Sequence, residues 1–122
     1  MKMKQAGLAV ALLLSMMQSA EAAPIWCVGK FQKLYISESG ELFVLPDWRQ
    51  DWVQLCNMNA DSKGITPTVC GTMFAAAKTA VSTKAVTTIA YWDRESPAPA
   101  ACNVVPTYQN APAPGYIMLH GD

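Results

Sequence analysis

The residues with the most clearly defined chemistry are four cysteines, Cys27, Cys56, Cys70 and Cys102. Four thiols can form disulfides, hold a structural zinc ion or carry out redox exchange. Zinc sites and redox pairs are typically built on a C-x-x-C pair, and no two cysteines of this chain have that spacing. Disulfides are therefore the expected chemistry if the chain reaches an oxidising compartment. Four cysteines allow three pairings, and their number alone does not choose among them.

The start of the chain predicts that it does reach such a compartment. Lys2 and Lys4 form a basic start, residues 6–17 are almost wholly apolar, and Ala20 and Ala22 are small residues at the two positions that a signal peptidase reads. This order is typical of a secretory signal peptide, and the apolar run is too short to span a bilayer. We expect cleavage after Ala22, because cleavage one residue later would put Pro24 next to the cleaved bond. We therefore expect a signal peptide over 1–22, a single domain over 23–122, and a secreted or periplasmic location.

Catalytic chemistry is poorly represented in the rest of the sequence. His120 is the only histidine, and it lies beside the C-terminus, where chain ends fray and a general base is hard to position. Two acidic pairs, Asp47 with Asp51 and Asp93 with Glu95, occupy polar connections typical of solvated turns. There is no phosphate-binding glycine loop and no calcium-binding loop. The sequence predicts a protein that is not an enzyme and needs no cofactor or metal.

The charge of the chain argues against two classes of partner. The sequence has nine basic and nine acidic residues, and loss of the signal peptide removes two of the former and one of the latter. The remaining net charge of about −1 gives no electrostatic attraction to nucleic acid or to anionic lipid. No later segment is long and apolar enough to cross a membrane. We expect no nucleic-acid partner and no membrane span after cleavage.

Aromatic residues beside polar ones are the better functional signal. Trp48 lies next to Asp47 in a polar connection, and Trp92 is followed closely by Arg94 at the end of a predicted strand. An aromatic face can cover the apolar C–H surface of a sugar while nearby polar groups hold its hydroxyls. The third candidate, Tyr108, lies in a proline-rich segment, where it could contact a partner or instead plug one end of the fold. These five residues are the predicted ligand contacts.

Periodicity and turn signals place these residues on a mainly β fold with one helix. Ser37-Glu38-Ser39-Gly40 is a hairpin signal, because Gly40 tolerates a positive φ. Thr66-Pro67 starts a helix, with Thr66 as the cap and Pro67 in the first turn. The helix has an apolar face at helical spacing, and five segments alternate or are rich in β-branched residues. The predicted strands are 26–36, 41–45, 52–58, 85–92 and 116–119.

The element order βββαββ is that of the OB-fold, a five-stranded Greek-key barrel, and we expect this fold. An α+β roll, with the helix across an open sheet, is the alternative. In the barrel the first and fourth strands are neighbours, which favours a Cys27–Cys102 disulfide. Cys56 and Cys70 are separated by one short polar loop, and we expect them to form the second bridge.

The sequence also resembles the B subunits of bacterial AB-type toxins, those of the Shiga toxin and subtilase cytotoxin kind. The similar segments are Cys27-Val28-Gly29-Lys30, the helix around Ala75-Ala76-Ala77-Lys78-Thr79-Ala80, and the strand Val86-Thr87-Thr88-Ile89, followed by Cys102. Cys56 and Cys70 have no counterpart in the Shiga type. The resemblance implies an OB barrel, a homopentamer and a face that binds a cell-surface glycan, and no sugar-binding residue is carried over from it.

Together these patterns predict a secreted, non-catalytic binding domain, with a glycan as the expected ligand. The alternative is a periplasmic interaction protein, such as an inhibitor or an accessory or structural subunit, that binds a secreted or periplasmic protein and has no affinity for sugars.

Overall fold

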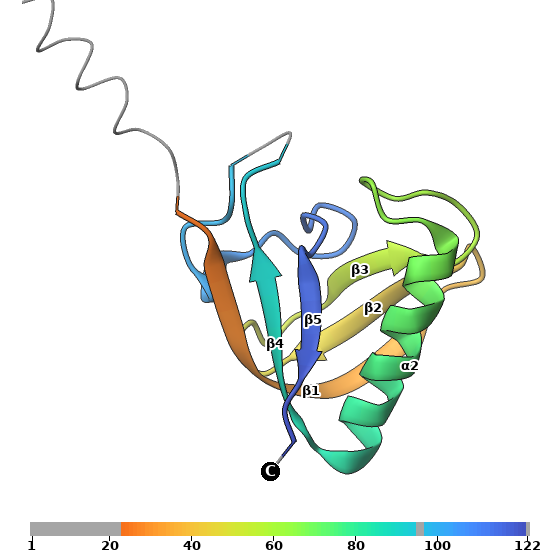
Figure 1. Ribbon diagram of the computed structural model, residues 1–122, viewed down its shortest axis with the longest axis horizontal. Helices are drawn as coiled ribbons and strands as arrows, with labels where there is room; N and C mark the ends of the chain where they lie inside the picture. The colour runs from red at the N-terminus through yellow and green to blue at the C-terminus, as the bar shows by residue number, and fades with distance from the viewer. Residues whose placement is uncertain (1–22, 95–96, 122) are drawn as a thin grey trace, which may run out of the picture.

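A computed structural model describes residues 23–94 and 97–121, which contain five strands and one α-helix (Figure 1). The predicted signal peptide, residues 1–22, lies outside the described residues. The elements are β1 (Ile25–Ile36), β2 (Glu41–Pro46), β3 (Val53–Asn57), α2 (Pro67–Thr83), β4 (Val86–Tyr91), the short 3₁₀-helix η1 (Cys102–Val104) and β5 (Tyr116–Leu119). The predicted content, mainly β with one helix and five strands, is confirmed.

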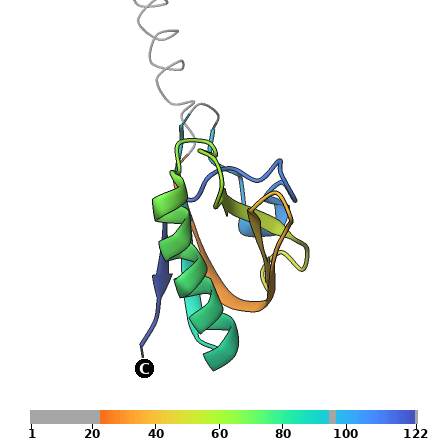
Figure 2. The same ribbon diagram turned by 90° about the vertical axis from the view of Figure 1, so that its right-hand side faces the viewer.

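All five strands form one antiparallel sheet in the order β3-β2-β1-β4-β5. The long strand β1 serves two partners. Its first half, from Ile25 to Lys30, pairs with β4, and its second half, from Phe31 to Ile36, pairs with β2. The register shifts between Phe31 and Lys33, where the strand changes partner. A bulge of this kind increases the local bend, and β1 curves strongly in Figures 1 and 2.

The sheet does not close into a barrel, because β3 and β5 are not paired. The outer edge of β3 is instead bonded to Tyr108 of the proline-rich segment. The Tyr108 N–H donates to the Trp52 carbonyl at 2.8 Å, and the Gln54 N–H donates to the Tyr108 carbonyl at 3.3 Å. The expectation of a closed barrel is therefore not confirmed. The sheet is open, as in the alternative roll, since a loop residue occupies the edge that β5 would need.

The helix α2 begins where its sequence predicts. The Thr66 hydroxyl accepts a hydrogen bond from the Val69 N–H at 3.3 Å, and Pro67 occupies the first turn. Lys84 ends the helix in the left-handed conformation, φ 57°, without a glycine. Cys70, Ala77 and Ala80 are buried on the face that packs on the sheet, and their small side chains allow close approach. The core lies between this face and the curved sheet (Figure 2).

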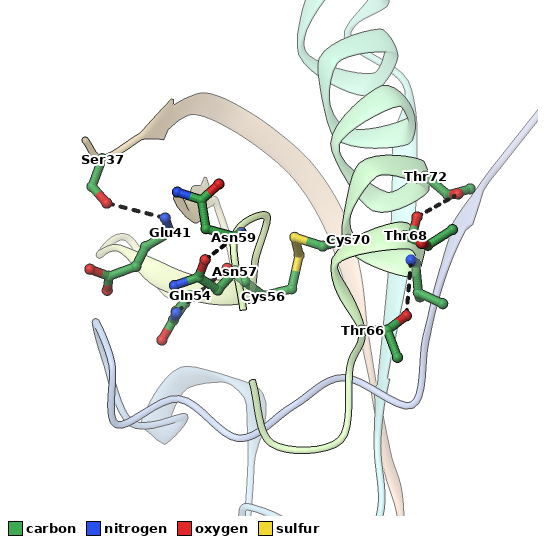
Figure 3. Close-up of a disulfide and its surroundings, with 11 residues drawn as sticks. Ser37, Glu41, Gln54, Cys56, Asn57, Asn59, Thr66, Thr68, Cys70 and Thr72 are labelled. Atoms are coloured by element: carbon green, nitrogen blue, oxygen red, sulfur yellow. Dashed lines mark hydrogen bonds between the residues drawn. A yellow bond between two sulfur atoms is a disulfide. The ribbon is translucent and has the colours of Figure 1, made fainter. Parts of the chain in front are cut away.

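Both predicted disulfides are confirmed. Cys27 of β1 bonds to Cys102 of η1 with a Cα–Cα distance of 5.5 Å, which anchors the proline-rich segment to the sheet. Cys56 of β3 bonds to Cys70 of α2 with a Cα–Cα distance of 5.6 Å (Figure 3). The second bridge therefore fixes the start of the helix against the end of β3. Across residues 23–94 and 97–121, no helix is long and apolar enough to span a membrane.

Candidate ligand-binding site

Trp48 and Asp47, two of the predicted contacts, lie in the connection after β2. Trp48 is half-buried, packs against the core and makes an edge-to-face contact with Tyr91, with ring centroids 6.5 Å apart. The Asp47 side chain lies over Gly29, where an added Cβ would overlap it. Trp48 Nε1 is buried and has no hydrogen-bond partner among the described residues. The Trp48 ring is thus mainly a packing group here.

Trp92 and Arg94 are brought together at the end of β4. The Arg94 guanidinium carbon lies 5.9 Å from the centroid of the Trp92 ring, a cation–π arrangement. Trp92 is 38% exposed, and its ring packs against Gly115 and lies 5.9 Å from the Tyr116 ring. A Cβ at position 115 would overlap the indole, so the ring can pack here only because residue 115 is a glycine. These residues form an exposed platform beside β5.

Tyr108 lies in a third place, within a group of four aromatic rings on the β1–β2–β3 part of the sheet. We call Tyr35, Phe43, Trp52 and Tyr108 the aromatic cluster. Tyr35 and Phe43 are register partners and stack with centroids 4.7 Å apart, and Trp52 meets Tyr35 edge-on at 4.7 Å. Tyr108 reaches Phe43 at 6.1 Å. Phe43 is buried, Tyr35 and Trp52 are half-buried, and Tyr108 is 43% exposed.

The backbone around Tyr108 holds the ring in an unusual position. Its φ is 53°, a left-handed conformation that is unfavourable for a bulky side chain. The two hydrogen bonds to the edge of β3 maintain it. Two basic side chains hold the flanking chain. Arg49 Nε donates to the Val105 carbonyl at 2.7 Å, and Lys63 Nζ donates to the carbonyls of Gln109, at 2.6 Å, and Ala111. Strain of this kind concentrates at functional sites, and contacts within the protein hold the loop in place.

Polar groups surround the aromatic cluster on one side. Gln109 Nε2 donates to the Glu41 carboxylate at 3.0 Å, which places an amide and a carboxylate beside the rings. Partial burial, and then the nearby Tyr108 and Glu41, raise the pKa of Tyr35 above its usual value. Figure 3 shows Glu41 near Gln54 and Asn57, at the same end of the β2–β3 hairpin. Hydroxyl, amide and carboxylate groups therefore converge around partly exposed rings.

A cleft of about 410 Å³ adjoins the cluster through Gln109. Its walls are prolines, among them Pro106 and Pro112, and its polar groups are Lys63, Gln109 and Asn110. This volume is within the range of small-molecule sites. Burial lowers the pKa of the Lys63 ammonium below its usual value. The cleft and the aromatic cluster thus share one loop.

Tyr108 is one of the contacts predicted from the sequence, whereas its companions Tyr35, Trp52, Glu41 and Gln109 are not among the predicted contacts. Part of the signal was available, because the hairpin turn at 37–40 sets the register that places Tyr35 opposite Phe43. The approach of Tyr108 had no local signal, since it depends on the path of the proline-rich segment.

Other chemistry is sparse in the described part of the chain. No group of three or more histidine, cysteine or acidic side chains is placed to hold a metal ion within residues 23–94 and 97–121. His120 Nε2 lies 2.6 Å from the Thr88 hydroxyl, which fixes the ring on the sheet.

Comparisons with known proteins found no matching family model, no similar curated protein and no similar solved structure. The function of this chain is therefore inferred from the geometry of its site.

Proposed function

We propose that the protein is a secreted or periplasmic, non-catalytic binding domain that binds a carbohydrate on the aromatic cluster. The observation that carries this proposal is the constrained, exposed ring of Tyr108 beside Glu41 and Gln109. A sugar presents an apolar C–H face and a rim of hydroxyls. The rings of Tyr108, Tyr35 and Trp52 can pack against the apolar C–H face. The Glu41 carboxylate and the Gln109 amide can form hydrogen bonds with the hydroxyls.

Preorganisation supports the same assignment. Binding a flexible ligand to a flexible loop costs conformational entropy on both sides. Here the loop is anchored by Arg49, by Lys63 and by the edge of β3, so the protein loses little freedom when a ligand arrives. A sugar with little or no charge does not need long-range electrostatic attraction to reach its site, and the nearly neutral chain provides none.

The proposal includes a fold of the OB type, a barrel that is open between β3 and β5. The pairing of β1 with both β2 and β4 supports it. The resemblance to toxin B subunits adds a homopentamer that presents glycan sites to a cell surface. Light scattering of the oxidised protein behind size exclusion tests the assembly, and a mass near five monomers is the expected result.

The binding proposal is tested on a glycan array and then by titration with the glycan that binds best. Tyr108→Ala and Gln109→Ala should each weaken binding about tenfold or more, which corresponds to about 1.4 kcal/mol. Trp26→Ala is the matched control, because Trp26 is 55% exposed in the β1–β4 half and makes no ring contact with the cluster.

Gln109→Ala separates recognition from folding, since it removes the rim amide and leaves the four rings in place. Circular dichroism and thermal unfolding confirm that each variant folds. The site is supported if Trp26→Ala binds the glycan as tightly as wild type while Tyr108→Ala and Gln109→Ala both lose affinity. Full affinity in folded Tyr108→Ala and Gln109→Ala would remove the aromatic cluster as the sugar site, and an inert array would favour the protein-binding alternative.

A further inference from the structure

The strand β5 is at the edge of the sheet, and the register with β4 shows which of its backbone groups face outward. The His120 N–H donates to the Val86 carbonyl at 2.9 Å, and Met118 and Tyr116 lie opposite Thr88 and Ala90. Along an antiparallel strand, every second residue directs its backbone N–H and C=O groups toward a given neighbouring strand. The backbone groups of Tyr116, Met118 and His120 are therefore the ones that face β4. The N–H and C=O groups of Ile117 and Leu119 therefore point away from β4, and no backbone partner reaches them in the described part of the chain.

A groove runs beside this edge. Its volume is about 240 Å³, and it is lined by Val69, Thr72, Met73 and Ala76 of α2 and by Gly115, Tyr116 and Ile117 next to β5. Figure 2 shows α2 and β5 lying side by side. The lining is mostly apolar, and Ala76 and Gly115 leave room because their side chains are small or absent. The volume is below the range of about 300–1,000 Å³ usual for whole small-molecule ligands, and it suits side chains of a longer ligand.

We propose that this groove binds an extended peptide segment of another protein, which adds to the sheet as a strand beside β5. The free N–H and C=O groups of Ile117 and Leu119 match the alternating groups of a peptide backbone, which neither a sugar nor a lipid tail provides. An aliphatic side chain of the peptide fills the space between Val69, Met73 and Ala76. This surface is separate from the aromatic cluster, so it does not rest on the carbohydrate proposal.

Charge defines the peptide further. Trp92 and Arg94 stand next to the Gly115–Tyr116 end of the groove, with Arg94 exposed and its Nη2 donating to the Pro114 carbonyl at 3.5 Å. Neither α2 nor β5 contains an acidic residue, and the carboxylate of Asp93, next to Arg94, already accepts a hydrogen bond from the Ala98 N–H at 2.7 Å. The peptide therefore carries a carboxylate that pairs with Arg94 and an apolar neighbour that packs on Trp92.

The test begins with a phage-displayed library of random twelve-residue peptides, selected on the oxidised domain. The best peptide is then synthesised and titrated against four variants. Leu119→Pro removes one outward N–H without breaking the ladder to β4, and Leu119→Ala is its control, because it removes the side chain and keeps the N–H. Ala76→Phe fills the groove, and Ala75→Phe adds the same ring at the exposed neighbouring position.

We expect Leu119→Pro and Ala76→Phe to weaken peptide binding at least tenfold, with both controls within about threefold of wild type. The selected peptides should combine an aliphatic residue with Asp or Glu, and Tyr108→Ala should bind them normally. Failure to select any peptide, or equal binding by all four variants, would overturn the proposal. A concentration-dependent dimer that Leu119→Pro abolishes, without peptide binding, would assign the edge to a second copy of this chain instead.

Discussion

Removing the Cys27–Cys102 disulfide should destabilise the domain more than removing Cys56–Cys70. A disulfide stabilises mainly by restricting the unfolded chain, and the restriction grows with the length of the closed loop. The two bridges join residues 75 and 14 positions apart. The chain-entropy relation gives about 4.5 kcal/mol for the longer loop and about 3 kcal/mol for the shorter one. Both are large parts of the roughly 5–15 kcal/mol typical of a domain's stability.

The cavity left by the substitution acts in the opposite direction. Cys56 and Cys70 are both fully buried, whereas Cys102 is only half-buried, so double alanine substitution leaves the larger void at the shorter loop. The predicted order of the two stability losses therefore requires that the effect of loop length exceeds the effect of the cavity. Comparing the two variants thus tests whether these disulfides act mainly by restricting the unfolded chain.

The measurement is guanidinium unfolding of the two double-alanine variants, followed by tryptophan fluorescence and extrapolated to water. The variant lacking Cys27 and Cys102 should lose about 1 kcal/mol or more beyond the other. Wild type with both bridges reduced serves as the lower reference. An equal loss in both variants, or a larger loss for Cys56→Ala/Cys70→Ala, would show that loop length does not set the contribution of these disulfides.

Further predictions concern single substitutions at three positions. Gly115→Ala should cost about 1–3 kcal/mol and alter Trp92 fluorescence, because the new Cβ overlaps the indole; unchanged stability and emission would contradict the packing described. Tyr91→Phe should raise stability by about 1 kcal/mol, because the buried Tyr91 hydroxyl has no hydrogen-bond partner among the described residues; destabilisation would indicate a buried water bound there. Burial raises the pKa of Tyr91 above its usual value of 10.0, so wild type should lose stability as pH rises above about 10, and Tyr91→Phe should lose less. Lys63→Met should speed amide exchange at 108–111 and cost about 1 kcal/mol, because two carbonyls lose their donor, whereas Lys78→Met on the exposed helix face should change neither.

Elements governed by local chemistry could be predicted from the sequence. Thr66 and Pro67 define the start of α2, and Ser37 to Gly40 define the first hairpin, because caps and turns depend on adjacent residues. The disulfide pairing also followed, since it needed only the order of the elements and the neighbouring positions of the first and fourth strands, which the open sheet keeps. Each predicted strand end lies within one residue of the observed end, as fraying ends allow.

The closure of the sheet and the composition of the site could not be predicted in the same way. Both depend on where residues 97–114 run, and a segment with five prolines has no periodicity that reveals its path. Its attachment to β3 through Tyr108 leaves the sheet open and creates the aromatic cluster in one step. The missed residues Tyr35 and Trp52 acquire their role only from this long-range contact.

The division of β1 between two partners bears on how the chain folds and oxidises. Its second half meets β2 across a tight turn, whereas its first half must wait for β4, about 60 residues further along. Short loops close faster than long ones, so the hairpin and the Cys56–Cys70 bridge should form before Cys27 finds Cys102. Until then the first half of β1 is an unpaired strand carrying a reactive thiol. A quenched oxidation time course should therefore accumulate a one-disulfide species with Cys27 and Cys102 still free, which makes this strand the point where misoxidation and aggregation begin.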